Sequence, residues 1–253
     1  MEIWLEMARS LMRHVGAIMV LPSASAGPDG VIVQGTASFV DTGEAKLIIT
    51  CAHVYNRFLE IRSDNPDAIL ILSGESGSEP AVITDAKCIC VGDKLLDIAV
   101  LEADLPEVVE ELGKEYFFCP EWPPRGATSE EAVCTIGFPG MYREPCGGAL
   151  RISSVVFADM VSTVSDRNVV FVDEQAERRL VTLNPCLARP TDLGGMSGSA
   201  IYVGTAAEPV RLVAIVYEVG IADGDDALKA WVYGARVDYL NADGTLNRAR
   251  MPW

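Results

Sequence analysis

The sequence predicts an all-β protein made of two packed β domains, with one short helix at its N-terminus. Short runs rich in Val, Ile, Thr and aromatic residues recur along the chain, and Gly, Pro, Asp and Asn separate them. A Pro-rich stretch at 119–130 interrupts the series, and prolines so close together cannot lie in a central strand. The 253 residues are enough to give each of two such domains its own core.

The N-terminal segment 1–14 is expected to form an amphipathic helix rather than a secretory signal. Charged side chains, beginning with Glu2, break its apolar stretch, and a signal peptide needs that stretch uninterrupted. The apolar face of this helix would carry Trp4, Leu5, Leu11 and Met12.

The first β domain is expected at residues 15–118. Its predicted strands lie at 31–40, 46–50, 68–73, 81–91 and 97–101. One helix is predicted at 104–113, where the final glycine would suit a C-terminal stop.

The stretch 119–130 is predicted to connect the first domain to a second β domain at 131–240. Strands of the second domain are expected at 132–138, 149–164, 168–173, 179–183, 199–203, 210–219 and 228–237. Residues 241–253 would form a C-terminal tail. Many short strands with few intervening helices are typical of sandwiches or barrels.

Composition argues against several classes of function. A net charge of −16 repels phosphate backbones, so nucleic acid is not an expected partner. No segment approaches the roughly 20 apolar residues of a membrane span, so no membrane association is expected. The chain also lacks a phosphate-binding loop and a dinucleotide fingerprint, and we predict no cofactor.

The cysteines indicate a reducing compartment. Their number, seven, is odd and their spacing fits no disulfide framework, which favours the cytoplasm. Cys88 and Cys90 would share one face of a strand, but a zinc site would need two further ligands. We therefore predict no metal site.

Histidine is the side chain most often used to move protons near neutral pH, and this chain has two. His14 lies in the amphipathic N-terminal segment. His53 follows the apolar run KLIITCA, where the chain would turn out of a sheet. Such a position leaves one edge of the imidazole held and the other free, so His53 is the candidate base.

A glycine-rich run, LGGMSGSAIY at 193–202, surrounds Ser197. Small residues on both sides of a serine permit a tight turn in which backbone N–H groups converge on one point. An acyl-transfer enzyme needs this convergence to stabilise the oxyanion of its tetrahedral intermediate. Gly195 and Ser197 are the expected N–H donors.

Asp97 opens the apolar run LLDIAVLEAD at 95–104. A carboxylate against a core edge must be paired or hydrogen-bonded, and a histidine N–H is a suitable partner. Asp93 and Asp104 are nearby alternatives, but neither borders the apolar run so directly.

Together these motifs resemble those of trypsin-like serine peptidases of the bacterial cytoplasmic type. The motifs are TCAHV at 50–54, DIAVL at 97–101 and GMSGSA at 195–200, in the order His, Asp, Ser. The stretches GTASFVDTGEAKLIITCAHV and VCTIGFPG resemble the openings of the first and second barrels. The resemblance spans roughly residues 30–240 and implies two packed β-barrels of the chymotrypsin type.

The resemblance also implies a catalytic triad of His53, Asp97 and Ser197. Ser197 would attack a peptide carbonyl, His53 would transfer its proton to the leaving amine, and Asp97 would orient the imidazole. Ser199 is the rival nucleophile, but the family pattern places the nucleophile at Ser197.

A substrate pocket is implied as well, with its floor at Thr191 and Asp192 and walls from Tyr217, Glu218, Val219 and Val232. The two valines would stand where open pockets have glycine and would favour a small residue before the scissile bond (P1). Alternatively, Asp192 or Glu218 points inward and selects Arg or Lys by charge pairing. A shift of one residue in the register of 228–237 would reverse the valine argument.

The predicted function is therefore that of a cytoplasmic serine endopeptidase acting on a protein or peptide substrate. The alternative is a catalytically silent trypsin-like module that binds peptides or a partner protein. Only about a dozen residues follow position 240, too few for an added binding domain, so we expect a narrow substrate range and a dedicated partner protein.

Overall fold

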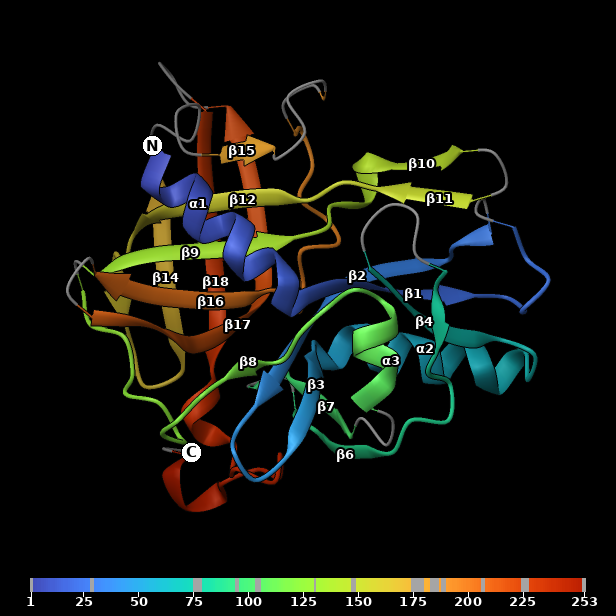
Figure 1. The fold of residues 1–253 in the computed structure, drawn as a ribbon, viewed down its shortest axis with the longest axis horizontal. Coiled ribbons are helices and arrows are strands. Elements are labelled where there is room, and N and C mark those ends of the chain that lie inside the picture. Colours follow the sequence, from blue (N-terminus) through green and yellow to red (C-terminus); the bar gives the residue numbers. More distant parts are fainter. Residues whose placement is uncertain are drawn as a thin grey trace.

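Two curled β-sheets make up most of the chain and lie side by side (Figure 1). The computed structural model describes residues 2–27, 30–74, 79–93, 96–102, 106–129, 131–146, 149–173, 180–182, 187, 190–205, 208–223 and 228–251. This arrangement confirms the predicted all-β class with two chymotrypsin-type β units and a short N-terminal helix.

The first sheet has eight strands in the order β5-β4-β1-β2-β3-β7-β6, with β8 paired to β2. Neighbouring strands are antiparallel except for the short parallel pair of β2 and β8. The strands are β1 (Val15–Leu21), β2 (Val33–Asp41), β3 (Lys46–Thr50), β4 (Ile69–Ser73), β5 (Ala81–Val82), β6 (Cys88–Val91), β7 (Ala99–Glu102) and β8 (Phe117–Phe118).

The second sheet also has eight strands, in the order β13-β14-β18-β17-β16-β9-β12-β15. They are β9 (Ala132–Gly137), β12 (Val155–Met160), β13 (Thr163–Val164), β14 (Asn168–Asp173), β15 (Leu180–Thr182), β16 (Ala200–Thr205), β17 (Glu208–Asp223) and β18 (Leu228–Arg236). A separate hairpin, β10 (Arg143–Cys146) with β11 (Ala149–Ile152), extends from it.

Three α-helices are described: α1 (Glu2–Leu11), α2 (Ala52–Asp64) and α3 (Pro106–Glu111). Single 3-10 turns follow at η1 (Met12–His14), η3 (Gly140–Tyr142), η5 (Val237–Tyr239) and η6 (Arg248–Arg250). Among the described residues, no helix combines the length and the apolar character that crossing a bilayer requires.

The N-terminal helix α1 lies across the second sheet, although the strand that follows it, β1, belongs to the first (Figure 1). Leu11 is buried and Met12 packs against the core, in keeping with the predicted apolar face. The side chains of Trp4 and Leu5 lie outside the described part of the structure. The predicted helix at 104–113 is present as α3, and Gly113 follows it at a φ of 69°.

The elements that the sequence prediction missed include strand β1 and helix α2, besides the short strands β8 and β10. Strand β1 is buried along its whole length, so it lacks the alternation of apolar and polar residues that indicates a half-buried strand. Helix α2 lies in a stretch that was expected to contain no helix. Its buried residues Val54, Tyr55 and Phe58 are spaced for one helical face, but many polar residues separate them.

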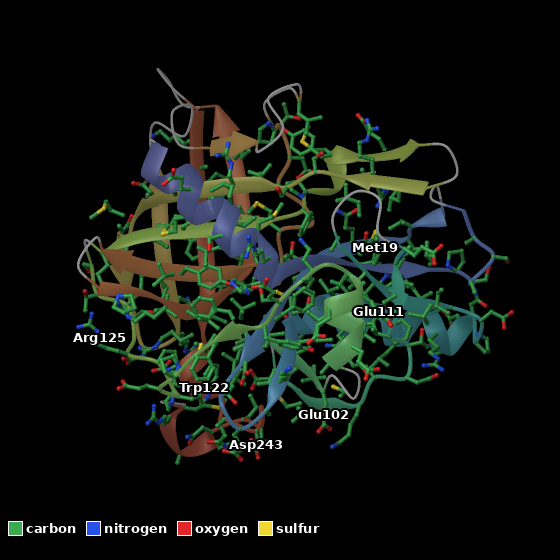
Figure 2. The ribbon with its side chains drawn as sticks, viewed as in Figure 1. Met19, Glu102, Glu111, Trp122, Arg125 and Asp243 are labelled. Atoms are coloured by element: carbon green, nitrogen blue, oxygen red, sulfur yellow. The ribbon has the colours of Figure 1, made fainter. Side chains whose placement is uncertain are left out.

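The segment 119–130 contains no helix or strand among its described residues and contacts both sheets. The backbone N–H of Cys119 donates to Asp41 of β2, and the indole of Trp122 donates to Leu240 at 2.9 Å (Figure 2). Arg211 of β17 donates to the carbonyl oxygen of Arg125. The five cysteines whose side chains the structure describes are free thiols: Cys51, Cys88, Cys90, Cys119 and Cys134.

Candidate active site

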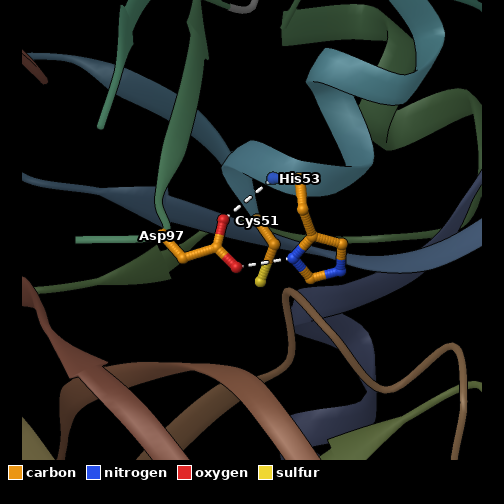
Figure 3. Close-up of side chains that lie close together, drawn as sticks. All are labelled: Cys51, His53 and Asp97. Carbon is orange, nitrogen blue, oxygen red and sulfur yellow. Dashed lines mark hydrogen bonds and ion pairs between the residues drawn. The ribbon is translucent and has the colours of Figure 1, made fainter. Parts of the chain in front are cut away.

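His53 and Asp97 meet in the structure, as the sequence predicted for a base and its orienting acid. Strand β3 ends at Thr50, and His53 lies in the first turn of α2. The Nδ1 atom of His53 lies 2.5 Å from Oδ2 of Asp97, and the His53 backbone N–H donates to Oδ1 at 2.8 Å (Figure 3). Both carboxylate oxygens therefore bind one residue, which fixes the ring and leaves its Nε2 edge free.

The Ser197 loop (residues 193–199) is held by strand β2 of the first sheet. Thr36 donates its backbone N–H to Ser197 O at 2.8 Å and its hydroxyl to Gly195 O at 2.9 Å. The hydroxyl of Ser38 donates to Gly198 O at 2.8 Å. Because three carbonyls of the loop bind the other sheet, contacts between the sheets determine its shape.

Gly198 occupies a position in this loop that only glycine fits. Its φ is 98°, and a Cβ there would overlap the carbonyl oxygen of Thr36 and lie 2.7 Å from the hydroxyl of Thr50. We expect Gly198→Ala to lower the free energy of unfolding by about 3 kcal/mol, from backbone strain and overpacking together. Urea denaturation would measure this change.

Gly126→Ala is the matched control for this prediction. The atom nearest to its added Cβ would lie at 3.6 Å, and its φ is not in the left-handed region. A surface substitution of this kind should change stability by no more than about 0.5 kcal/mol. Equal stability losses in the two variants would show that the close approach at Gly198 does not matter.

The backbone N–H groups of Gly195 and Ser197 differ from their neighbours. The N–H groups of Gly194, Met196, Gly198 and Ser199 each donate to an acceptor within the protein. Those of Gly195 and Ser197 donate to no other described residue.

The orientation of two peptide groups explains this difference. The carbonyl of Gly194 accepts the N–H of Gly140 at 2.7 Å, and the carbonyl of Met196 accepts the hydroxyl of Ser199 at 2.6 Å. Since the C=O and N–H of one trans peptide point in opposite directions, the N–H groups of the following residues point away from these partners. These are the two donors that the sequence predicted for an oxyanion.

Two links bring the His53 turn and the Ser197 loop to the same place. Gly35 of β2 lies close to both of them. A Cβ on this residue would be 3.0 Å from the Val54 side chain and 3.1 Å from Ser197 O. The carbonyl oxygen of Val216 accepts the Cys51 thiol at 2.9 Å and the Gly198 N–H at 2.7 Å. Residues that flank the base and the serine therefore share contacts.

The Ser197 side chain is half-buried and, within the described residues, makes no hydrogen bond with His53. Hydrogen bonds of catalytic groups are often long in structures without substrate. Ser199, the rival nucleophile, is fully buried, and its hydroxyl is bound to the Met196 carbonyl. Of the two serines, Ser197 is half-buried and Ser199 is fully buried.

Cys51, His53 and Asp97 form a group whose possible metal-ligating atoms all lie within 4.8 Å of one another. The thiol of Cys51 is fully buried and donates to Val216 O. Burial, followed by the charge of Asp97, raises the pKa of this thiol well above its usual value. A metal would require the thiolate and would compete with Asp97 for Nδ1, so these groups fit a hydrogen-bonded dyad better.

The predicted pocket residues occupy different environments. Thr191 and Asp192 are exposed, and Asp192 accepts the N–H of Gly194 in its own loop. Tyr217 is half-buried beside the dyad. Burial, followed by the charges of Glu218, Tyr233 and Asp97, raises the pKa of the Tyr217 phenol.

The two valines expected to fill the pocket face the core of the second sheet. Val232 is fully buried there, and Val219 packs against the same cluster. On β18 the neighbouring side chains of Trp231 and Tyr233 point to the opposite face. A Cβ on Gly220 would overlap the Trp231 ring, and the Tyr233 ring lies 6.3 Å from that of Tyr217.

Trp231 and Tyr233 were not among the predicted pocket residues. The sequence prediction noted that a shift of one residue would reverse the valine argument, and the core-facing position of both valines fits that alternative, while the substrate pocket itself stays a prediction.

No protein-family model matches the chain, and no curated protein is similar to it in sequence. Solved structures with a similar fold include a thermostable serine protease, AL20, from an extremophilic microorganism, which is 15% identical with a TM-score of 0.49. That alignment covers 89% of this chain and 91% of the other.

The serine protease domain of the Sesbania mosaic virus polyprotein is 14% identical, with a TM-score of 0.44. The alignment covers 88% of this chain and 89% of the domain. These likenesses concern the fold, so the function is argued below from the geometry of the site.

Proposed function

We propose that this chain is a serine endopeptidase that cleaves peptide bonds in a protein substrate through His53, Asp97 and Ser197. The observation that carries the proposal is the pair of N–H groups at Gly195 and Ser197, which donate to no acceptor among the described residues and lie beside the half-buried Ser197 side chain. Such donors stabilise the negative charge that develops on a carbonyl oxygen under attack.

In the proposed mechanism, Ser197 Oγ attacks the peptide carbonyl carbon while His53 Nε2 accepts the hydroxyl proton. The same nitrogen then protonates the departing amine, which leaves an acyl ester on Ser197. Water, deprotonated by His53, hydrolyses the ester and restores the serine. Throughout, Asp97 accepts a hydrogen bond from Nδ1–H of His53 and stabilises the imidazolium.

The second candidate function is a silent module that binds peptides without cleaving them. Its support is the missing hydrogen bond between Ser197 and His53 among the described residues. A silent module would bind peptide and leave it intact, whereas the endopeptidase would release two fragments.

Cleavage profiling on a peptide library distinguishes the two functions. Wild-type protein and Ser197→Ala would be incubated in parallel, with products identified by mass spectrometry. We expect fragments from the wild type alone, and the sequences at the cut would give the P1 preference. If neither protein cuts any peptide, or both cut equally, the proposed function is wrong.

The P1 preference itself is proposed to depend on the β17–β18 face that carries Glu218, Trp231 and Tyr233. The indole of Trp231 lies over Gly220 and reduces the space for a substrate side chain on this face, which supports a small P1 residue. The exposed carboxylate of Glu218 supports the basic alternative. The library profile decides between a small apolar P1 residue and Arg or Lys.

Substrate range and compartment remain predictions from the sequence. Free thiols at five described cysteines support a reducing cytoplasm. A narrow range with a dedicated partner protein would be contradicted by rapid digestion of several unrelated unfolded proteins.

A further inference from the structure

Cys51 lies between the His53–Asp97 pair and the Ser197 loop. It directly follows β3, two residues before His53, and its side chain is fully buried. Figure 3 shows its sulfur beneath the Asp97 carboxylate and the imidazole, and the ligating atoms of all three residues lie within 4.8 Å.

The Cys51 thiol binds the second sheet through a shared acceptor. Its Sγ donates to Val216 O at 2.9 Å, and the same oxygen accepts the N–H of Gly198 at 2.7 Å. Gly198 directly follows Ser197, the proposed nucleophile, and Cys51 lies two residues before His53, the proposed base. The Val216 carbonyl therefore binds a near neighbour of each.

Other hydrogen bonds restrict the movement of Val216 and Gly198. Val216 also donates its N–H to Ser199 O at 2.8 Å, so β17 holds both Gly198 and Ser199. The hydroxyl of Ser38 holds the Gly198 carbonyl from β2. Because these contacts hold Gly198 and Val216 in place, the bond from the Cys51 thiol to Val216 O sets the distance between the His53 turn and Ser197.

We propose that Cys51 is a positioning residue, which sets the alignment of His53 with Ser197 through the Val216 carbonyl that it shares with Gly198. This inference rests on the proposed function. The sulfur takes no part in bond making. Its role is to hold two backbones that lie on different sheets and are more than 140 residues apart in sequence.

The test compares Cys51→Ala, Cys51→Ser and a matched control, Cys134→Ala. Cys134 is also fully buried, but it lies in β9 and contributes no contact to the dyad or the loop in the described structure. With a peptide substrate from the library, we expect Cys51→Ala to lower kcat about 10-fold, since small misplacements of reacting groups are costly. KM should change less than about 2-fold, because the contacts that bind substrate remain.

Cys51→Ser should recover most of kcat, because its hydroxyl can still donate to Val216 O, and Cys134→Ala should keep the wild-type kcat. Wild-type kcat in Cys51→Ala, or an equal loss in Cys134→Ala, would overturn the positioning role.

Amide hydrogen exchange tests the inference without relying on activity. Gly198 donates its N–H to the shared carbonyl, so its exchange should accelerate about 10-fold in Cys51→Ala and remain unchanged in Cys134→Ala. If the wild type cleaves nothing, the proposed function fails and this measurement alone decides the role of Cys51. Unchanged exchange of Gly198 in Cys51→Ala would overturn that role.

Discussion

Ser197→Ala is expected to abolish labelling by a fluorophosphonate probe and to lower kcat about 10⁶-fold. The probe reacts with a serine hydroxyl only where a base removes its proton and N–H donors stabilise the oxygen charge. The half-buried Ser197 side chain lies beside such donors, and alanine removes the attacking atom while keeping the loop backbone. In-gel fluorescence of the purified protein would show the label.

Ser199→Ala is the matched control. Its hydroxyl is buried and binds the Met196 carbonyl, so its loss should cost about 1 kcal/mol of stability. The Met196 carbonyl still accepts the Ser199 backbone N–H, so the Ser197 N–H should keep its direction and labelling should persist. Label that survives in Ser197→Ala, or disappears only in Ser199→Ala, would reassign the nucleophile.

Asp97→Asn is expected to lower kcat about 10⁴-fold with little change in fold. An asparagine can accept the His53 backbone N–H with its oxygen, but it then presents an NH₂ group to Nδ1. Two donors cannot face each other, so the imidazole would carry its proton on Nε2, where it should accept one from Ser197. Nitrogen NMR of the imidazole would report this change of tautomer.

Asp93→Asn provides the comparison for Asp97. Asp93 lies four residues upstream, and its carboxylate accepts the N–H of Leu96 at 3.2 Å. An asparagine oxygen can replace that acceptor, so kcat should stay within about 2-fold of the wild type. Retained activity in Asp97→Asn, or a comparable loss in Asp93→Asn, would contradict the assigned role.

The sequence was sufficient to predict the two sheets and the pairing of His53 with Asp97. Runs rich in Val, Ile, Thr and aromatic residues predicted most strands, and a single histidine at the end of an apolar run left few candidates for a base. Helix α2 was missed because its apolar face is narrow and because the helix begins almost directly after a strand. The sequence prediction assigned this stretch neither a strand nor a helix, whereas packing of Phe58 and Val54 against the first core stabilises a helix.

The finer geometry depends on contacts between distant residues. The directions of the N–H groups at 195 and 197 follow from bonds of the preceding carbonyls, one of them to Gly140. In β17, the pairing shifts between Val216 and Glu218, and a bulge of this kind changes which side chains face the core. Neither feature has a local signal in the sequence.

The dependence of the Ser197 loop on β2 has a consequence for the molecule as a whole. Thr36 and Ser38 hold three carbonyls of a loop that belongs to the other half of the chain. A fragment comprising the second half alone would carry Ser197 but would lack the β2 donors that hold the loop in its conformation. The shape of the turn at that serine is therefore a joint property of both halves, and the proposed reactivity would arise only after they dock during folding.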